Sequence, residues 1–129
     1  MARVEVPISV GELVDKVTIL EIKSEKIADA EKRANIGREL AALTAVLKPL
    51  VAATPGIAPL KAELRSINEA LWQIEDDIRD CERQRDFGPS FVELARSVYR
   101  TNDRRAATKR KIDDLTGSEL VEEKSYAPY

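Results

Sequence analysis

Three short groups of polar side chains have members three residues apart and carry the functional groups needed to hold a charged ligand. In order along the chain they are Asp15, Thr18 and Glu21, then Trp72 and Glu75, then Tyr99, Asn102 and Arg105. Residues three apart are neighbours on the surface of a helix. If the helices that carry them pack together, the three groups meet at one polar centre, and these eight residues are the candidate ligand-binding site.

Arg105 interrupts an otherwise apolar helix face, between Val98 and Ile112. A buried charge costs several kcal/mol unless it is paired and hydrogen-bonded. The favoured interpretation is structural: Glu21 or Glu75 pairs with Arg105, and the network specifies the order of the helices. The alternative is a small cavity in which Arg105 and Asn102 hold an anion, such as a sugar nucleotide, in two-pronged fashion. A carboxylate of the group would then act as a base.

Several kinds of chemistry are excluded by residue types that the chain lacks. It contains no histidine, which removes the commonest general base and the commonest metal ligand. The single cysteine, Cys81, falls on an apolar stripe, where a thiol behaves as a small hydrophobe. Glu69, Glu75 and Asp76 offer oxygen ligands for Mg²⁺ or Mn²⁺, but acidic faces of solvated helices are far commoner. We therefore predict no cofactor and no metal site, and favour a non-enzymatic protein over an enzyme.

The element that must position the middle group is a long helix with heptad spacing. Its apolar stripe consists of Leu60, Leu64, Ile67, Leu71, Ile74, Ile78 and Cys81. Such a stripe must be buried against other helices. The composition, 43% hydrophobic and only 5% aromatic, is also typical of helical proteins.

Turn and capping residues divide the rest of the chain. Ser9 and Glu12 form a capping box at the start of a first helix, and a second helix opens near Asn35 and bends or ends at Pro49. Residues 54–59 form a loop, with Pro59 at the start of the long helix and Gly88 at its end. A second capping box, residues 90–93, starts a fourth helix that Gly117 closes. The prediction is one all-α domain over residues 1–129. It is an antiparallel bundle of about four helices, with an extended arm at 1–8 and a tail at 118–129.

Charges are segregated between the two long helices. Residues 96–111 hold seven basic residues against Asp103, and residues 69–82 hold six acidic residues against Arg79. A hairpin turning between Gly88 and Pro89 brings Glu69 level with Thr108. We therefore predict ion pairs between the two helices in place of nucleic-acid binding. The net charge of -2 and the lack of a long apolar run predict no membrane association and a cytoplasmic location.

Several longer stretches carry a resemblance to a known family. They are residues 6–16 (VPISVGELVDK), 18–23 (TILEIK), 68–72 (NEALW), 74–76 (IED), 98–105 (VYRTNDRR) and 122–126 (EEKSY). On these motifs the chain resembles, over nearly its whole length, a family of small uncharacterised bacterial proteins. The resemblance implies a link to glycosyltransferases and surface polysaccharide, and it supplies no catalytic residue.

The leading hypothesis is a non-enzymatic binding or scaffold module that acts on another protein, such as a sugar-transfer enzyme. We also predict a homodimer, from Ile19 and Ile22 lying off the main apolar stripe, from the β-prone arm, and from Tyr126 and Tyr129 in the tail. The alternative is a small anionic ligand, bound or turned over at the polar cluster around Arg105.

Overall fold

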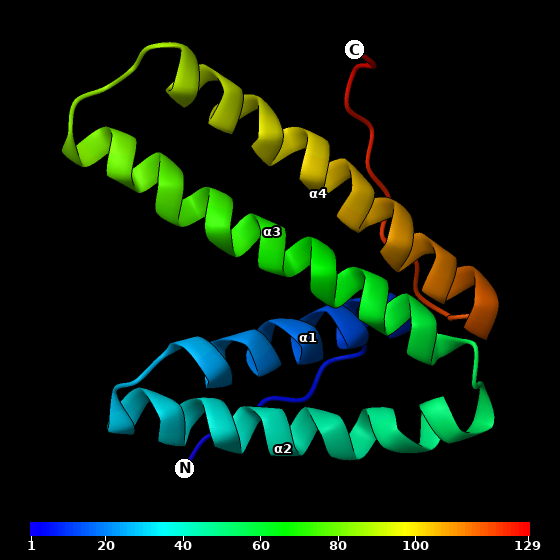
Figure 1. The fold of residues 1–129 in the computed structure, drawn as a ribbon. Coiled ribbons are helices and arrows are strands. Elements are labelled where there is room, and N and C mark those ends of the chain that lie inside the picture. The colour runs from blue at the N-terminus through cyan, green and yellow to red at the C-terminus, as the bar shows by residue number, and fades with distance from the viewer.

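The computed structural model describes residues 1–129, which form four helices and no strand. The helices are α1 (Val10–Lys26), α2 (Ala30–Ala53), α3 (Ile57–Arg83) and α4 (Pro89–Thr116). They form two antiparallel hairpins, α1–α2 and α3–α4, that meet at one end of the molecule and diverge at the other (Figure 1). The predicted all-α antiparallel bundle is confirmed. No helix has an apolar stretch of the length that crossing a bilayer requires.

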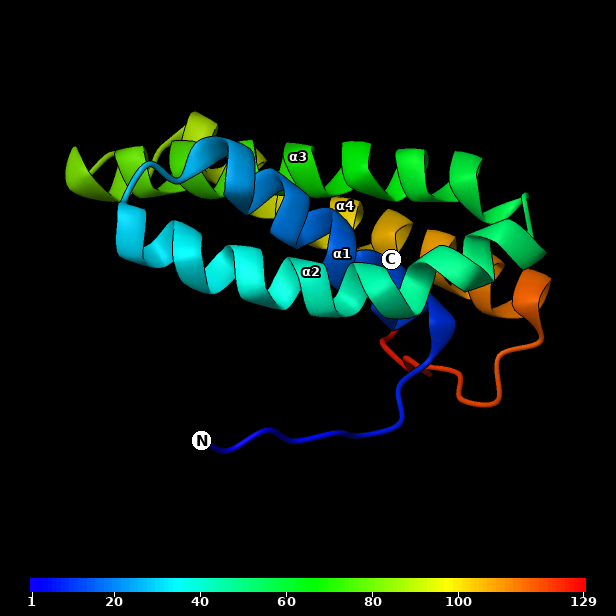
Figure 2. The ribbon, with the colours of Figure 1, turned by 90° about the horizontal axis from the view of Figure 1, so that it is seen from below.

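Helix α1 occupies the centre of the fold, since it packs against each of the other three helices. Seen from below, α1 and α2 lie against one side of the α3–α4 hairpin (Figure 2). The core joins Val14 and Val17 of α1 to Leu47 of α2, Leu64 of α3 and Ile112 of α4. Fully burying one such side chain stabilises the fold by about 1.5–3 kcal/mol. Polar residues on α1 are therefore held where three helices meet.

The first two helices begin at side-chain caps. The Ser9 hydroxyl accepts a hydrogen bond from the Glu12 N–H at 3.0 Å, which confirms the predicted start of α1. The start predicted for the second helix, near Asn35, is wrong, because Asp29 caps it by accepting from the Lys32 N–H at 3.0 Å. Helix α2 also continues through Pro49 to Ala53.

The turn between α3 and α4 differs from the prediction at both ends. Helix α3 runs from Ile57, not Pro59, and ends at Arg83, not Gly88. Gly88 is the N-cap of α4 and donates its N–H to Asp86 Oδ1 at 3.0 Å, so the proposed capping box at residues 90–93 is not formed.

The turn lies closer to the N-terminus than predicted, so different residues of α3 and α4 lie level with each other. Thr108 donates to Glu63 at 3.3 Å and so does not lie level with Glu69. The predicted ladder of ion pairs between the two helices is also wrong. Three acids of α3 and three bases of α4 pair within their own helix, as Glu75 does with Arg79. One ion pair, Glu63–Lys111 at 3.9 Å, joins α3 to α4.

The outer part of the α3–α4 hairpin, residues 71–100, extends beyond α1 and is called the distal hairpin below. It contains no buried residue. Its apolar seam is only half-buried and consists of Leu71, Ile74, Ile78 and Cys81 of α3 with Phe91, Leu94 and Val98 of α4. Two helices by themselves cover only the side of each seam residue that faces the partner helix, so the seam remains partly open to solvent.

The two ends of the chain have no regular structure. Residues 1–8 form an exposed extended arm that makes no strand (Figure 2). The tail from Ser118 folds back along α4, where Glu122 pairs with Lys109 at 2.7 Å and Glu123 pairs with Arg110 at 3.1 Å. Two basic residues of α4 are therefore balanced by the tail, and one, Lys111, by α3.

Candidate functional site

A buried polar network joins α1, α3 and α4 around the carboxylate of Asp15, whose side chain is 1% exposed. Arg105 donates two hydrogen bonds to this carboxylate, from Nε to Oδ1 at 2.9 Å and from Nη2 to Oδ2 at 2.5 Å. The side-chain amide of Asn68 donates to Asp15 Oδ1 and to Thr18 Oγ1, both at 3.0 Å. The Thr18 hydroxyl donates to the Asp15 carbonyl at 2.7 Å. The predicted polar seam therefore exists, and Asp15 pairs with Arg105 in place of Glu21 or Glu75.

The surroundings of Asp15 keep it ionised. Burial by itself raises the pKa of the Asp15 carboxyl, but hydrogen bonds from Arg105 and Asn68 and the charges of Arg105 and Lys109 outweigh burial. The resulting pKa lies below the ordinary value of 3.8. On Arg105, the hydrogen bond to Asp15 raises the guanidinium pKa against the opposing effect of burial. A carboxylate that is inaccessible and already held by an arginine is unsuited to act as a general base.

The lowered pKa of Asp15 predicts a pH dependence of stability. Because the folded-state pKa lies below the unfolded-state value, the stabilisation is complete above the unfolded pKa of about 4 and is lost as the pH falls through the folded pKa. We expect the free energy of unfolding, measured by urea titration between neutral and acid pH, to fall more steeply for the wild-type protein than for Asp15→Asn. Two parallel curves would contradict this assignment.

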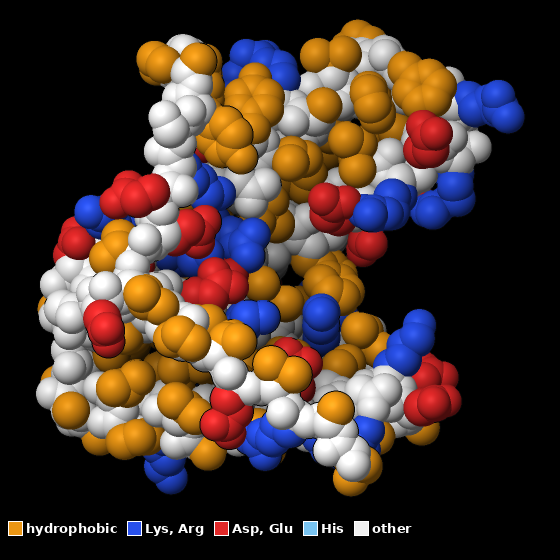
Figure 3. All heavy atoms as spheres, turned by 180° about the vertical axis from the view of Figure 1, so that it is seen from behind, with side chains coloured by type: hydrophobic (Ala, Val, Ile, Leu, Met, Phe, Trp, Pro, Cys, Tyr) orange, Lys and Arg blue, Asp and Glu red, His pale blue; other side chains and the backbone are white.

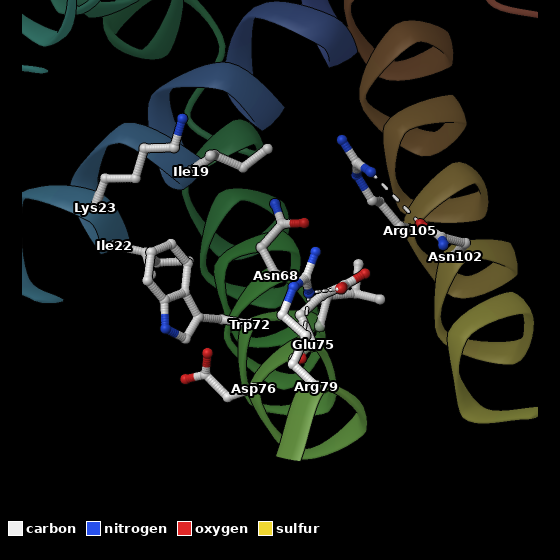
Figure 4. A pocket seen from close by; sticks show the side chains of 11 residues that line it. Ile19, Ile22, Lys23, Asn68, Trp72, Glu75, Asp76, Arg79, Asn102 and Arg105 are labelled. Atoms are coloured by element: carbon white, nitrogen blue, oxygen red, sulfur yellow. Dashed lines mark hydrogen bonds and ion pairs between the residues drawn. The ribbon is translucent and has the colours of Figure 1, made fainter. Parts of the chain in front are cut away.

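A cleft of about 480 Å³ opens above the network, between α1, α3 and α4. Figure 3 shows the molecule hollowed between its two diverging hairpins, with apolar side chains inside the hollow. The lining residues from α1 are Ile19, Ile22 and Lys23; those from α3 are Asn68, Leu71, Trp72, Glu75, Asp76 and Arg79; and those from α4 are Asn102 and Arg105. Their side chains converge from three helices (Figure 4). Four of the predicted residues, Trp72, Glu75, Asn102 and Arg105, therefore border one cleft, and Asp15 and Thr18 lie in the network beside it.

Two predicted residues lie elsewhere. Glu21 pairs with Lys61 at 3.1 Å and borders a separate groove of about 620 Å³ between α1, α2 and α3. Tyr99 is 44% exposed and packs edge-on against Tyr129, with ring centroids 5.2 Å apart. Each helical interval of three residues turns the side chain by about 60° from the starting direction. After two intervals Glu21 points away from Asp15, and Tyr99 points away from Arg105.

Sequence reasoning missed several members of the site. Asn68, which bridges Asp15 and Thr18, directly follows Ile67 of the heptad stripe, and a polar residue beside such a stripe is a usable signal. Lys109 is buried and held by Glu12 at 2.6 Å and by Glu122 at 2.7 Å. Burial lowers the Lys109 pKa, but hydrogen bonds to these two carboxylates more than compensate, so its pKa is raised. No local pattern links these three residues, which come from α1, α4 and the tail.

Two carboxylates at the site are already paired with arginines. Glu75 is tied to Arg79, and Asp15 to Arg105. The Nη1 end of Arg105 makes one long contact, 3.5 Å to Asn102 Oδ1, and is the part of the guanidinium with the most hydrogen-bonding capacity left. No three acidic or cysteine side chains converge as metal ligands, and this includes Glu69, Glu75 and Asp76.

Comparison with known proteins gives one match. No curated protein and no solved structure matches the chain. The sequence pattern of a family of unknown function (DUF6165) matches residues 4–129. The match spans the network, the cleft and the tail. The expectation that the chain is a member of an uncharacterised family is confirmed, and the protein belongs to DUF6165.

Proposed function

We propose that the protein is a non-enzymatic scaffold that works as a homodimer joined through the distal hairpin. The observation that carries this proposal is the half-buried seam of residues 71–100. The inner part of the α3–α4 hairpin is covered by α1, which supplies a third helix. The distal part has no such cover and keeps the same heptad spacing. A second distal hairpin would complete a four-helix arrangement there.

The apolar surface of the distal hairpin has the character of an interface. Apolar side chains gather over it on the face that also holds the hollow (Figure 3). Phe87 and Val92 are each at least half exposed and extend the seam toward the tip. Contiguous exposed apolar surface of this kind marks association sites in proteins.

Charge favours a second copy over an unrelated partner. Within the distal hairpin, residues 71–83 of α3 carry five carboxylates against two arginines, and residues 89–100 of α4 carry two arginines against one carboxylate. No ion pair joins α3 to α4 within this region. A two-fold axis that sets α3 of one copy beside α4 of the other would bring the acidic and basic edges together.

Oligomeric state tests this proposal. Size-exclusion chromatography with light scattering at tens of micromolar is expected to give twice the chain mass of 14.4 kDa. Ile78→Glu is expected to give the single-chain mass, because each carboxylate buried in the seam costs at least about 2 kcal/mol. Ala70→Glu is the matched control, since it places the same charge on the same helix at an exposed position outside the distal hairpin and should leave the dimer intact.

Circular dichroism should give equal helix content for both variants, because neither position lies in the buried core. A wild-type protein that stays at 14.4 kDa over a wide concentration range would overturn the homodimer. So would loss of the dimer in Ala70→Glu to the same degree as in Ile78→Glu.

A further inference from the structure

We infer that the cleft between α1, α3 and α4 binds a nucleoside phosphate, with the base on Trp72 and the phosphate between Lys23 and Arg105. The cleft, about 480 Å³, falls within the range of roughly 300–1,000 Å³ typical of small-molecule sites. It lies at the inner end of the distal hairpin, which supplies Leu71, Trp72, Glu75, Asp76 and Arg79 to its lining. The inference does not rest on the homodimer, because every lining residue belongs to one chain.

The wall of the cleft offers an aromatic surface. Trp72, half-buried on α3, is the only tryptophan of the chain. Trp72 of α3 and Ile22 of α1 both line the open space (Figure 4). An indole on the wall of a cleft presents a face on which a planar base can stack. Ile19 and Leu71 add apolar lining that excludes water from such a contact.

The inner end of the cleft offers positive charge. Asp15 occupies the Nε and Nη2 positions of Arg105 and so holds the guanidinium rigid, while Nη1 has only the 3.5 Å contact to Asn102. A phosphate oxygen is a much stronger acceptor for this group than an amide at that distance. Lys23 lies across the cleft from Arg105 (Figure 4) and forms no ion pair within the protein. A phosphate bound between Lys23 and Arg105 would neutralise the charge of Lys23, which has no partner within the protein.

The outer end has the opposite polarity. Asp76, one turn beyond Trp72, forms no ion pair and can accept hydrogen bonds from amino or hydroxyl groups. At the inner end, beside Arg105, the amide nitrogen of Asn102 makes no hydrogen bond and can donate one to the phosphate. The cleft thus combines a cationic end, an aromatic wall and an acceptor-bearing end, and a nucleotide combines a phosphate, a planar ring and hydrogen-bond donors in the same order.

Tryptophan fluorescence tests this directly, because the single indole lies in the cleft. Titration with AMP and with GMP is expected to change the emission saturably, while adenosine and inorganic phosphate bind about tenfold more weakly or less, since each lacks one half of the recognition. Lys23→Gln is expected to weaken AMP binding about tenfold through loss of a charge-assisted hydrogen bond. Lys26→Gln, exposed in the same helix and outside the cleft, is the matched control and should bind AMP like the wild type.

The same titration in the Ile78→Glu variant separates this inference from the homodimer, because a single chain contains the whole cleft. Unaltered emission with both nucleotides at millimolar concentration would overturn the inference. Equal affinity for adenosine and AMP, or an unchanged affinity in Lys23→Gln, would overturn the assignment of the phosphate to Lys23 and Arg105.

Discussion

Asp15→Ala is expected to lower the free energy of unfolding by about 3 kcal/mol, because it leaves the Arg105 guanidinium half-buried without a counter-ion. Two charge-assisted hydrogen bonds from Arg105 and one hydrogen bond from Asn68 end on this carboxylate. The side chain of Arg105 retains 30% of its exposure, so water reaches part of the abandoned charge. This exposure places the expected loss at the lower end of the range for a broken buried pair.

Urea denaturation followed by circular dichroism measures this effect. The double variant Asp15→Leu with Arg105→Leu is expected to recover most of the loss, because removing both charges removes the desolvation cost as well. Asp114→Ala is the control: Asp114 pairs with Arg110 in an exposed i,i+4 arrangement, and its loss should cost less than about 0.5 kcal/mol. A loss below about 1 kcal/mol in Asp15→Ala would mean that the pair contributes little to the fold.

Gly11→Ala is expected to cost about 3 kcal/mol, because the first turn of α1 touches the backbone of α4. A Cβ atom at Gly11 would lie 2.5 Å from the Lys109 carbonyl oxygen and 2.9 Å from Asp113 Oδ1. The Gly11 N–H also donates to that Asp113 oxygen at 2.7 Å, so the helices cannot separate without stretching a buried hydrogen bond. The closest contact is with the main chain of Lys109, which cannot move aside as the end of a flexible side chain can.

Gly37→Ala is the matched control for this prediction. Gly37 is exposed inside α2, and a Cβ atom there meets nothing within 4 Å. The substitution is expected to stabilise the protein by about 0.5–1 kcal/mol through the higher helix propensity of alanine. Thermal unfolding of the two variants side by side should move the melting temperature in opposite directions. Equal shifts would mean that the close approach at Gly11 does not limit the packing of α1 on α4.

Much of the fold follows from local patterns. The heptad stripe of residues 60–81 predicts α3, and the Ser9 cap predicts where α1 begins. The cost of burying Arg105 predicts that a carboxylate must meet it, and Asp15 does. These inferences succeed because helix periodicity, capping and charge desolvation depend on residue type and short-range spacing.

The errors have two origins, and the first is the relation between elements. The turn after α3 begins at Gln84, several residues earlier than Gly88 suggests, and this displaces every expected pair across the hairpin. The second is the spacing within a helix: side chains separated by two intervals of three residues point about 120° apart around the helix axis. For that reason Glu21 and Tyr99 lie outside the site, where they contact Lys61 and Tyr129.

The amino-acid sequence by itself determined that the protein is helical, where most of its helices lie, and that an arginine on the inner face of α4 requires an acidic partner. Only the tertiary structure decided that the partner is Asp15, that Asn68 joins it, and that a cleft opens beside Trp72. The physical reason is that a helix forms from contacts within a few residues. The angle and register at which α1 crosses α3 and α4 depend on turns and core side chains far apart in the chain.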